Sequence, residues 1–197
     1  MIDWDVRYSE PGYAYGTRPN DFLREHATRL PGRRVLSLAE GEGRNAVFLA
    51  GQGYEVTAVD ASPVAMRKTA MLAGQNGLAV HVHTADLADY DIEPGRWDGV
   101  VSIFCHVPPA VRATLHQQVV AGLRAGGVLL LEAYTPEQVG LGTGGPKDAG
   151  MTMTAQTLEQ ELDGLEILLL EETQREVIEG KYHTGTGAVV QCIARKV

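Results

Sequence analysis

After residue 33 the chain alternates between short aliphatic runs and longer stretches with helical periodicity. Five of the runs have the composition of buried strands, at residues 34–39, 55–60, 79–84, 99–104 and 128–133. The stretches between them place apolar residues three or four apart, at residues 45–52, 62–76 and 108–123. Strand–helix–strand alternation with short glycine turns predicts a parallel sheet covered by helices, which is an α/β fold.

Two more strand-like runs, 165–171 and 188–194, follow one another without a strong helix between them. Strands in direct succession form antiparallel pairs. We therefore expect a Rossmann-like, doubly wound sheet of seven strands, mostly parallel with the last strand antiparallel, in a single domain over residues 1–197. The glycine-rich stretch 136–155 predicts a long loop, either a lid over a functional site or a floppy insertion.

Charge and apolar patterning narrow the class of partner. The chain has 17 Lys+Arg against 25 Asp+Glu, a net charge of −8, which argues against a phosphate-backbone binder. No signal-peptide pattern opens the chain, and its longest apolar run, residues 128–131, is far shorter than the ~20 residues of a membrane span. We expect a cytoplasmic protein that binds neither nucleic acid nor membrane. The pattern predicts no oligomeric state.

Metal chemistry has little support in the sequence. Cys105 and Cys192 are the two cysteines, and they form no metal-spaced pair. His81 and His83 alternate on one predicted strand, but no further ligand accompanies them. We interpret the cysteines as reduced core thiols and the histidines as structural, and we expect no metal site.

Three predicted strand ends carry the features of a nucleoside site. The first strand leads into Gly41-Glu42-Gly43 and a helix N-terminus, where the backbone can approach a ligand closely. The second strand ends at Asp60, placed to accept from ribose hydroxyls. The third leads to Asp86, which could accept from an adenine amine or merely cap a turn. Together they predict an adenosine-containing ligand at the carboxyl edge of the sheet.

Two cofactor classes use this layout. Residues 41–46 match G-x-G-x-x-A, the dinucleotide fingerprint, so an NAD(P)-dependent oxidoreductase is one alternative. However, little chain remains for a nicotinamide half, and no Tyr-x-x-x-Lys occurs in the sequence. The predicted antiparallel pair at the end of the sheet favours the other class.

The segments VLSLAEGEGRNA (35–46) and LRAGGVLLLE (123–132) resemble the glycine loop and the turn into strand five of class I S-adenosylmethionine (SAM) dependent methyltransferases. The segments WDVRY (4–8), YAYGTRPNDFL (13–23) and EGKYH (179–183) are similar to the small bacterial tellurite-resistance and thiopurine-type enzymes. The class I methyltransferases usually have an acidic residue where Ser37 stands and a glycine where Ala39 stands. Glu40 could supply the missing charge.

The resemblance implies SAM as the cofactor and methyl transfer to a small-molecule acceptor, such as a thiol or a chalcogen oxyanion. A non-catalytic SAM-binding module is a further alternative. The expected cofactor contacts lie in the N-terminal segment and at the strand ends: Tyr15, Glu40, Gly41, Gly43, Asn45, Asp60, Ala61, Ala85, Asp86, Leu87 and Ile103.

The acceptor side rests on fewer residues. His106, after the fourth strand, is the candidate to orient or deprotonate an acceptor, or it caps the next helix. Lys147, Arg175 and His183 are candidate acceptor contacts, or they are solvated surface. Aromatic residues crowd residues 1–30, so this segment is expected to cover the cofactor, or its rings anchor a terminal helix.

Overall fold

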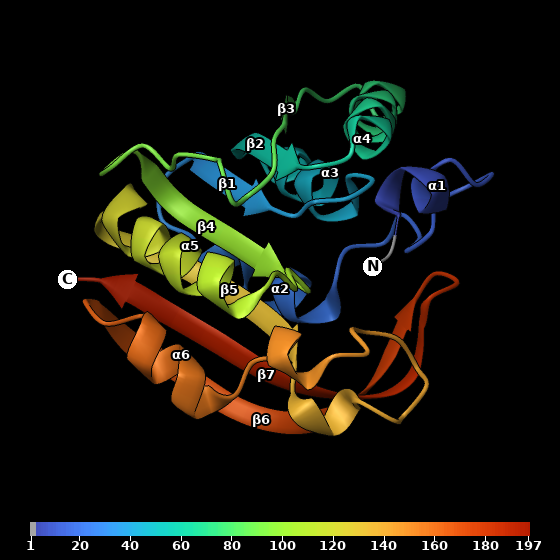
Figure 1. Ribbon diagram of the computed structural model, residues 1–197. Coiled ribbons are helices and arrows are strands. Elements are labelled where there is room, and N and C mark those ends of the chain that lie inside the picture. The colour runs from blue at the N-terminus through green and yellow to red at the C-terminus, as the bar shows by residue number, and fades with distance from the viewer. Residues whose placement is uncertain (1–2) are drawn as a thin grey trace.

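The computed structural model describes residues 3–197. Its centre is a seven-stranded sheet in the order β3-β2-β1-β4-β5-β7-β6 (Figure 1). The strands are β1 (Arg34–Leu38), β2 (Glu55–Asp60), β3 (His81–Thr84), β4 (Trp97–Ile103), β5 (Leu123–Tyr134), β6 (Leu165–Glu179) and β7 (His183–Lys196). Strands β1 to β5 pair in parallel, whereas β7 is antiparallel to both β5 and β6. The predicted sheet is confirmed.

Helices cover both faces of the sheet. They are α1 (Trp4–Tyr8), α2 (Asp21–His26), α3 (Arg44–Gly51), α4 (Pro63–Gln75), α5 (Pro109–Gly122) and α6 (Ala155–Glu161), with short 3-10 turns η1 (Ala27–Arg29), η2 (Pro136–Gln138) and η3 (Ala149–Met151). Apolar side chains of α5 and α6 pack with Leu36 and Leu38 on one face. Those of α2, α3 and α4 pack with Val35 and Val56 on the other. Successive strand residues face opposite sides, so the buried strands are mostly apolar on both faces.

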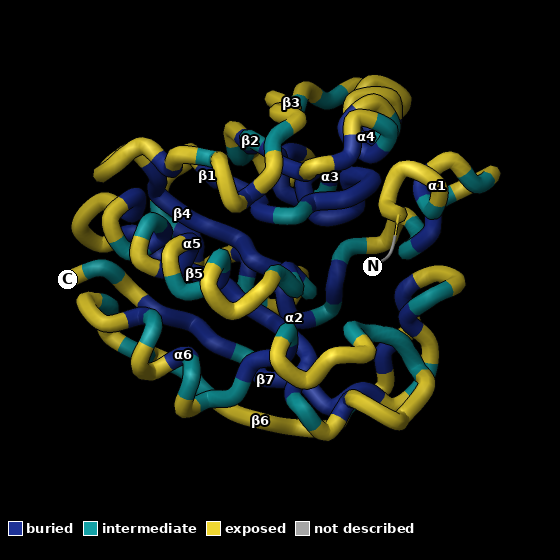
Figure 2. Tube along the Cα trace, in the orientation of Figure 1, coloured by how far each residue is buried: buried dark blue, intermediate teal, exposed yellow. Residues whose placement is uncertain are grey.

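The structure differs from the predicted elements at the sheet edges. Strand β3 is exposed rather than buried, because it lies at one edge of the sheet (Figure 2). Strands β6 and β7 are far longer than predicted, since each pairs with the other along most of its length. Gly126 and Gly127 lie within β5 instead of preceding it. No helix among residues 3–197 is long and apolar enough to cross a membrane.

The loop at 136–155 is packed rather than floppy. Gln138 is 1% exposed, and its amide donates to the carbonyl of Gly144 (3.0 Å) while its oxygen accepts from the backbone of Ala188 (2.9 Å). Arg112 of α5 donates to the carbonyl of Thr152 (3.0 Å). These contacts hold both ends of the loop against β7 and α5.

Candidate functional site

Asp60 joins the two strand ends at the centre of the carboxyl edge. One carboxylate oxygen accepts from the backbone N–H of Gly41 (2.9 Å) and the other from that of Ser62 (2.9 Å). Burial raises the pKa of Asp60 above its ordinary value, although both backbone hydrogen bonds lower it. The predicted neighbourhood of Asp60 and the glycine loop is therefore present.

The glycines of the loop have different neighbours. Gly41 and Gly43 both have positive φ, 67° and 97°. A Cβ on Gly43 would lie 2.8 Å from the Cα of Thr69 in α4, whereas a Cβ on Gly41 would lie 3.0 Å from the phenol oxygen of Tyr8. Gly43 thus allows α3 to pack on α4, and Gly41 faces the N-terminal segment. Ala39, where the family usually has glycine, also adopts a positive φ of 47°.

Glu40 fills the N-terminus of α3 with its own side chain. One carboxylate oxygen accepts from the backbone N–H groups of Asn45 (3.0 Å) and Ala46 (2.9 Å), and the other accepts from the hydroxyl of Ser37. The residue at the helix N-cap is Gly43, which has no side chain to offer. Glu40 is therefore the cap of α3, and it places a carboxylate beside the position where the family usually has one.

Residues 3–20, here called the strap, cross the carboxyl edge over the glycine loop. The backbone N–H of Ala14 donates to Glu42 (2.6 Å). Lys68 of α4 pairs with the same carboxylate (2.7 Å) and donates to the carbonyl of Gly12 (2.7 Å). The ring of Tyr8, which is 5% exposed, lies against Gly41. The strap contains helix α1 and lies over the glycine loop, and its cover over a cofactor stays a prediction.

The remaining predicted cofactor residues lie around this edge at different depths. Leu87 and Ile103 are buried, Ala85 is half-buried and Ala61 is exposed. Asp86 is exposed, and one of its carboxylate oxygens accepts from the backbone N–H of Ala88 (2.9 Å), which caps a turn; its contact with an adenine amine stays a prediction.

Of two further predicted residues, Tyr15 makes a contact within the strap, and Asn45 ties the strap to helix α3. Tyr15 accepts from Arg7 (3.0 Å), and the side-chain oxygen of Asn45 accepts from the backbone of Asn20 (3.0 Å). These contacts neither require nor exclude a bound cofactor, so the assignments stay predictions.

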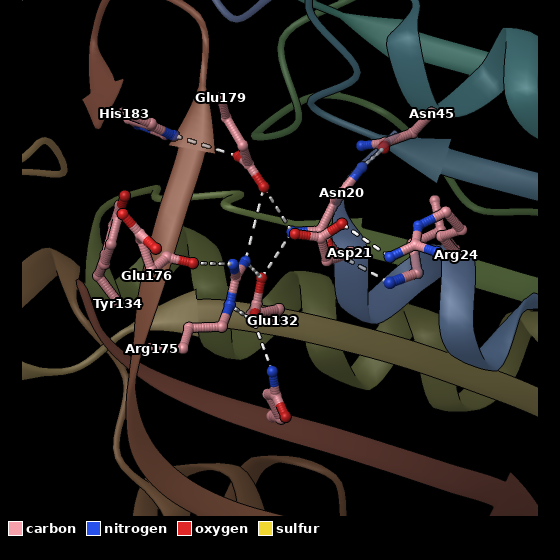
Figure 3. Close-up of polar contacts among 12 residues, drawn as sticks. Asn20, Asp21, Arg24, Asn45, Glu132, Tyr134, Arg175, Glu176, Glu179 and His183 are labelled. Carbon is pink, nitrogen blue, oxygen red and sulfur yellow. Dashed lines mark hydrogen bonds and ion pairs between the residues drawn. The ribbon is translucent and has the colours of Figure 1, made fainter. Parts of the chain in front are cut away.

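A buried polar network lies beside the loop, on the β5–β7 side of the sheet (Figure 3). Glu132 is completely buried. One of its oxygens accepts from Arg175 (2.8 Å) and Gln191 (2.6 Å), and the other accepts from Arg175 (2.6 Å) and Asn20 (2.6 Å). Asn20 also donates to Glu179 (2.9 Å). The network fastens the end of the strap to three strands.

Arg44 extends this network toward the glycine loop. Its Nη2 lies 2.7 Å from a carboxylate oxygen of Glu179. Burial raises the pKa of Glu179, but His183 and Arg44 outweigh it and lower that pKa to about 2. The carboxylate therefore stays ionised, and the pair is neutral overall.

Four buried polar atoms next to the network lack a hydrogen-bond partner among residues 3–197. One is Glu179 Oε2, which is still ion-paired with Arg44 Nη2; the other three are Arg44 Nη1, Tyr134 Oη and His183 Nδ1. The nearest oxygen of Glu179 is 3.6 Å from His183 Nδ1, which is too long for a hydrogen bond. Buried polar atoms are normally paired. The three atoms therefore mark a place that would hold a polar ligand or water.

Aromatic rings form the wall of this place. The ring centroid of His183 lies 4.5 Å from that of Tyr15, 5.0 Å from Phe104 and 5.3 Å from Tyr134. Burial lowers the pKa of His183 and raises that of Tyr134. Near neutral pH the imidazole is therefore uncharged, and the phenol keeps its proton as a donor.

His106 does not match its predicted role in this arrangement. Its Nδ1 lies 3.0 Å from the carbonyl of Met151, and its Nε2 accepts from the backbone N–H of Tyr134 (3.3 Å). Burial lowers its pKa to about 4. Both ring nitrogens are engaged with the backbone, so no lone pair is free to take a proton from an acceptor. His106 instead links β5 to the 136–155 loop, and it does not cap α5.

The other three predicted acceptor contacts have different surroundings in the structure. Arg175 gives two side-chain N–H groups to Glu132 and a third to the carbonyl of Glu176 (3.0 Å), so it holds the network together. Lys147 is exposed on the loop. Only His183 lies at the unpaired atoms. Sequence reasoning missed Arg44 and Tyr134; Tyr134 ends strand β5, so the strand-end rule that selected His106 could have found it.

Comparison with known proteins connects this geometry to a family. Residues 35–127 match the family model described as a methyltransferase domain. Ribosomal RNA small subunit methyltransferase B of Thermus thermophilus is 38% identical over 78 residues, 38% of this chain and 20% of that protein. The methyltransferase YbaJ of Bacillus subtilis is 28% identical over 90 residues, 46% of this chain and 32% of that protein. The chain thus spans between a fifth and a third of the length of these curated relatives.

A solved structure extends the likeness to the whole fold. TehB from Haemophilus influenzae superposes with a TM-score of 0.74 at 19% identity, over 90% of this chain and 62% of that one. Residues 35–127 are thus similar to a methyltransferase domain, and the strand order with its antiparallel last strand is the fold that the resemblance to class I SAM-dependent methyltransferases implies, a class whose cofactor is SAM. In its fold, the chain resembles TehB.

Proposed function

We propose that this chain transfers the methyl group of SAM to a small acceptor held beside Arg44, Tyr134 and His183. The observation that carries the acceptor side is the set of three buried, unpaired polar atoms next to the glycine loop. The acceptor class that suits them is a thiol or a chalcogen oxyanion. Arg44 Nη1 and the Tyr134 phenol are both donors, and donors of this kind stabilise a thiolate or an anionic oxygen.

The residues at the cofactor side fit an adenosine cofactor. The Asp60 carboxylate lies at the end of β2, beside Gly41, where it can accept from ribose hydroxyls. When bound, SAM supplies a methyl group already activated on a sulfonium. The buried carboxylates of Asp60 and Glu40 suit that positive charge.

The chain's own residues would mainly position the reactants and exclude water. The strap lies over the glycine loop, and the 136–155 loop packs beside the aromatic wall. Positioning and desolvation are the principal aids to an in-line displacement on an activated donor. An acceptor that is already ionised needs no general base, which agrees with the engaged nitrogens of His106.

Calorimetry tests the cofactor side. We expect wild type to bind SAM and S-adenosylhomocysteine (SAH), and Asp60→Ala to bind both at least ~10-fold more weakly, a loss of about 1.4 kcal/mol. Tight NAD(H) binding without a SAM signal would favour the oxidoreductase alternative. Unchanged SAH binding by Asp60→Ala would remove only the ribose assignment.

Transfer of labelled methyl groups tests the acceptor side. The panel contains small thiols, tellurite, selenite and an RNA fragment, since one relative is a ribosomal RNA methyltransferase. Arg44→Lys keeps the positive charge but removes the planar guanidinium and its two-nitrogen donor geometry. We therefore expect kcat/KM for an anionic acceptor to fall at least ~10-fold. The matched control is Arg24→Lys, at an exposed pair with Asp21. Binding of SAM without turnover of any acceptor would support a non-catalytic module.

A further inference from the structure

The N-terminus of α3 is the natural anion position of this fold. In α/β folds with a glycine loop, free N–H groups at that helix end commonly bind a phosphate or pyrophosphate. Residues 41–46 even match the dinucleotide pattern. Whether this loop can take a phosphate therefore depends on what already occupies the helix end.

Here the helix end is occupied by the chain itself. Glu40 is 6% exposed, and its carboxylate accepts from the N–H groups of Asn45 and Ala46. The Ser37 hydroxyl donates to its second oxygen and directs the carboxylate inward. Two of the N–H groups that a phosphate would use are thus already bonded to a carboxyl oxygen of the chain.

We propose that Glu40 is a specificity-determining residue, which excludes phosphate-bearing nucleotides from the glycine loop and leaves it to a cationic adenosine cofactor. This inference rests on the proposed function. A pyrophosphate would have to displace the carboxylate or lie beside it, and like charges at short range repel. A sulfonium or ammonium group is attracted to the same carboxylate. Glu40 therefore separates the two cofactor classes that share this layout.

The test compares SAH with adenosine diphosphate on wild type and three variants by calorimetry. Wild type is expected to bind SAH at least ~100-fold more tightly than adenosine diphosphate, about 2.7 kcal/mol. Glu40→Gln keeps the side-chain size and removes the charge, and should reduce that ratio at least ~10-fold. Ser37→Asp combined with Glu40→Gln returns a carboxylate to the same place and should restore the ratio.

Glu42→Gln is the matched control. It removes the same charge two residues away, where the carboxylate contacts Ala14 and Lys68 instead of the helix end. The ratio of SAH affinity to adenosine diphosphate affinity in Glu42→Gln should stay within ~2-fold of that in wild type, because the Glu42 carboxylate does not occupy the helix N-terminus. A change equal to that of Glu40→Gln would assign the selectivity to net charge and overturn the inference.

Two further outcomes keep the inference distinct from the proposed function. If wild type binds SAH but Glu40→Gln leaves the ratio unchanged, the inference fails and the proposed function stands. If wild type binds no SAH, the proposed function itself fails. Should Glu40→Gln not fold, titration of wild type with inorganic pyrophosphate still decides, because binding that SAH displaces would show a free anion position at the loop.

Discussion

Two buried carboxylates at the same sheet edge are held in opposite ways. Glu40 is bonded by Ser37, Asn45 and Ala46, all within six residues of it. Glu132 is bonded by Asn20, Arg175 and Gln191, which are 112, 43 and 59 residues away. The expected cofactor side is thus built from one local segment, and the proposed acceptor side from segments that only the finished fold brings together.

The largest expected effect is on the long-range cluster. Glu132→Ala removes the buried acceptor of Arg175, Asn20 and Gln191, and removing one partner of a buried ion pair costs about 3–5 kcal/mol. Urea unfolding measures the loss. Glu171→Ala, at an exposed position on β6, should change the free energy of unfolding by less than about 0.5 kcal/mol. Equal losses in the two variants would contradict the role given to the network.

Acid should destabilise the acceptor side through His106. Its folded pKa of about 4 lies below the ordinary 6.5, so the unfolded chain binds more protons between these values. Stability from this group is complete above pH ~6.5 and falls as the pH drops toward ~4, by up to about 3 kcal/mol. In His106→Phe this component of the pH dependence should disappear from urea unfolding curves.

The control for that measurement is His81→Gln, because His81 is exposed on β3. Its pH dependence should match that of wild type. A His106→Phe curve with the full wild-type slope would assign the acid sensitivity to other groups.

Loosening the strap should have an intermediate effect. Lys68→Met leaves the buried Glu42 without its ammonium partner and frees two strap carbonyls, a loss of about 1–3 kcal/mol. Fluorescence of Trp4, which stacks on Tyr8 at 5.5 Å, reports the strap in a Trp97→Phe background. Lys181→Met removes only an exposed pair with Glu10 and should cost less than about 0.5 kcal/mol.

The smallest expected effect has the opposite sign. Ala39 has a φ of 47°, which is unfavourable for a residue with a Cβ. Ala39→Gly should therefore stabilise the fold by up to about 1 kcal/mol, measured as a rise in Tm. Phe104 also has a positive φ, 53°, but its ring stacks on Tyr134 at 4.4 Å. Phe104→Gly should destabilise the fold, because the loss of the ring's packing outweighs the relief of the unfavourable backbone conformation.

The cofactor side was largely predictable from sequence. Strands β1, β2 and β4, the glycine loop and the place of Asp60 follow from short-range patterns, because each parallel strand ends at the same edge. The expectation that Glu40 supplies a charge near Ser37 agrees with their hydrogen bond. Asp86 caps a turn through one oxygen, and its predicted adenine contact stays a prediction.

The acceptor side was predicted less well. His106 and Arg175 were selected for their chemistry, but tertiary contacts engage both with other groups. Arg44 was visible in the glycine motif, yet its unpaired nitrogen arises only because Glu179 approaches from the far hairpin. No local pattern encodes that approach.

The sequence by itself determined the α/β class and the antiparallel last strand, because these depend on periodicity and on the order of neighbouring elements. The tertiary structure alone decided which side chains face an acceptor. A polar group is available to a ligand only when no other group of the fold has paired with it. For Arg44, Tyr134 and His183, that outcome depends on the strap, the glycine loop, β5 and the β6–β7 hairpin meeting at one edge.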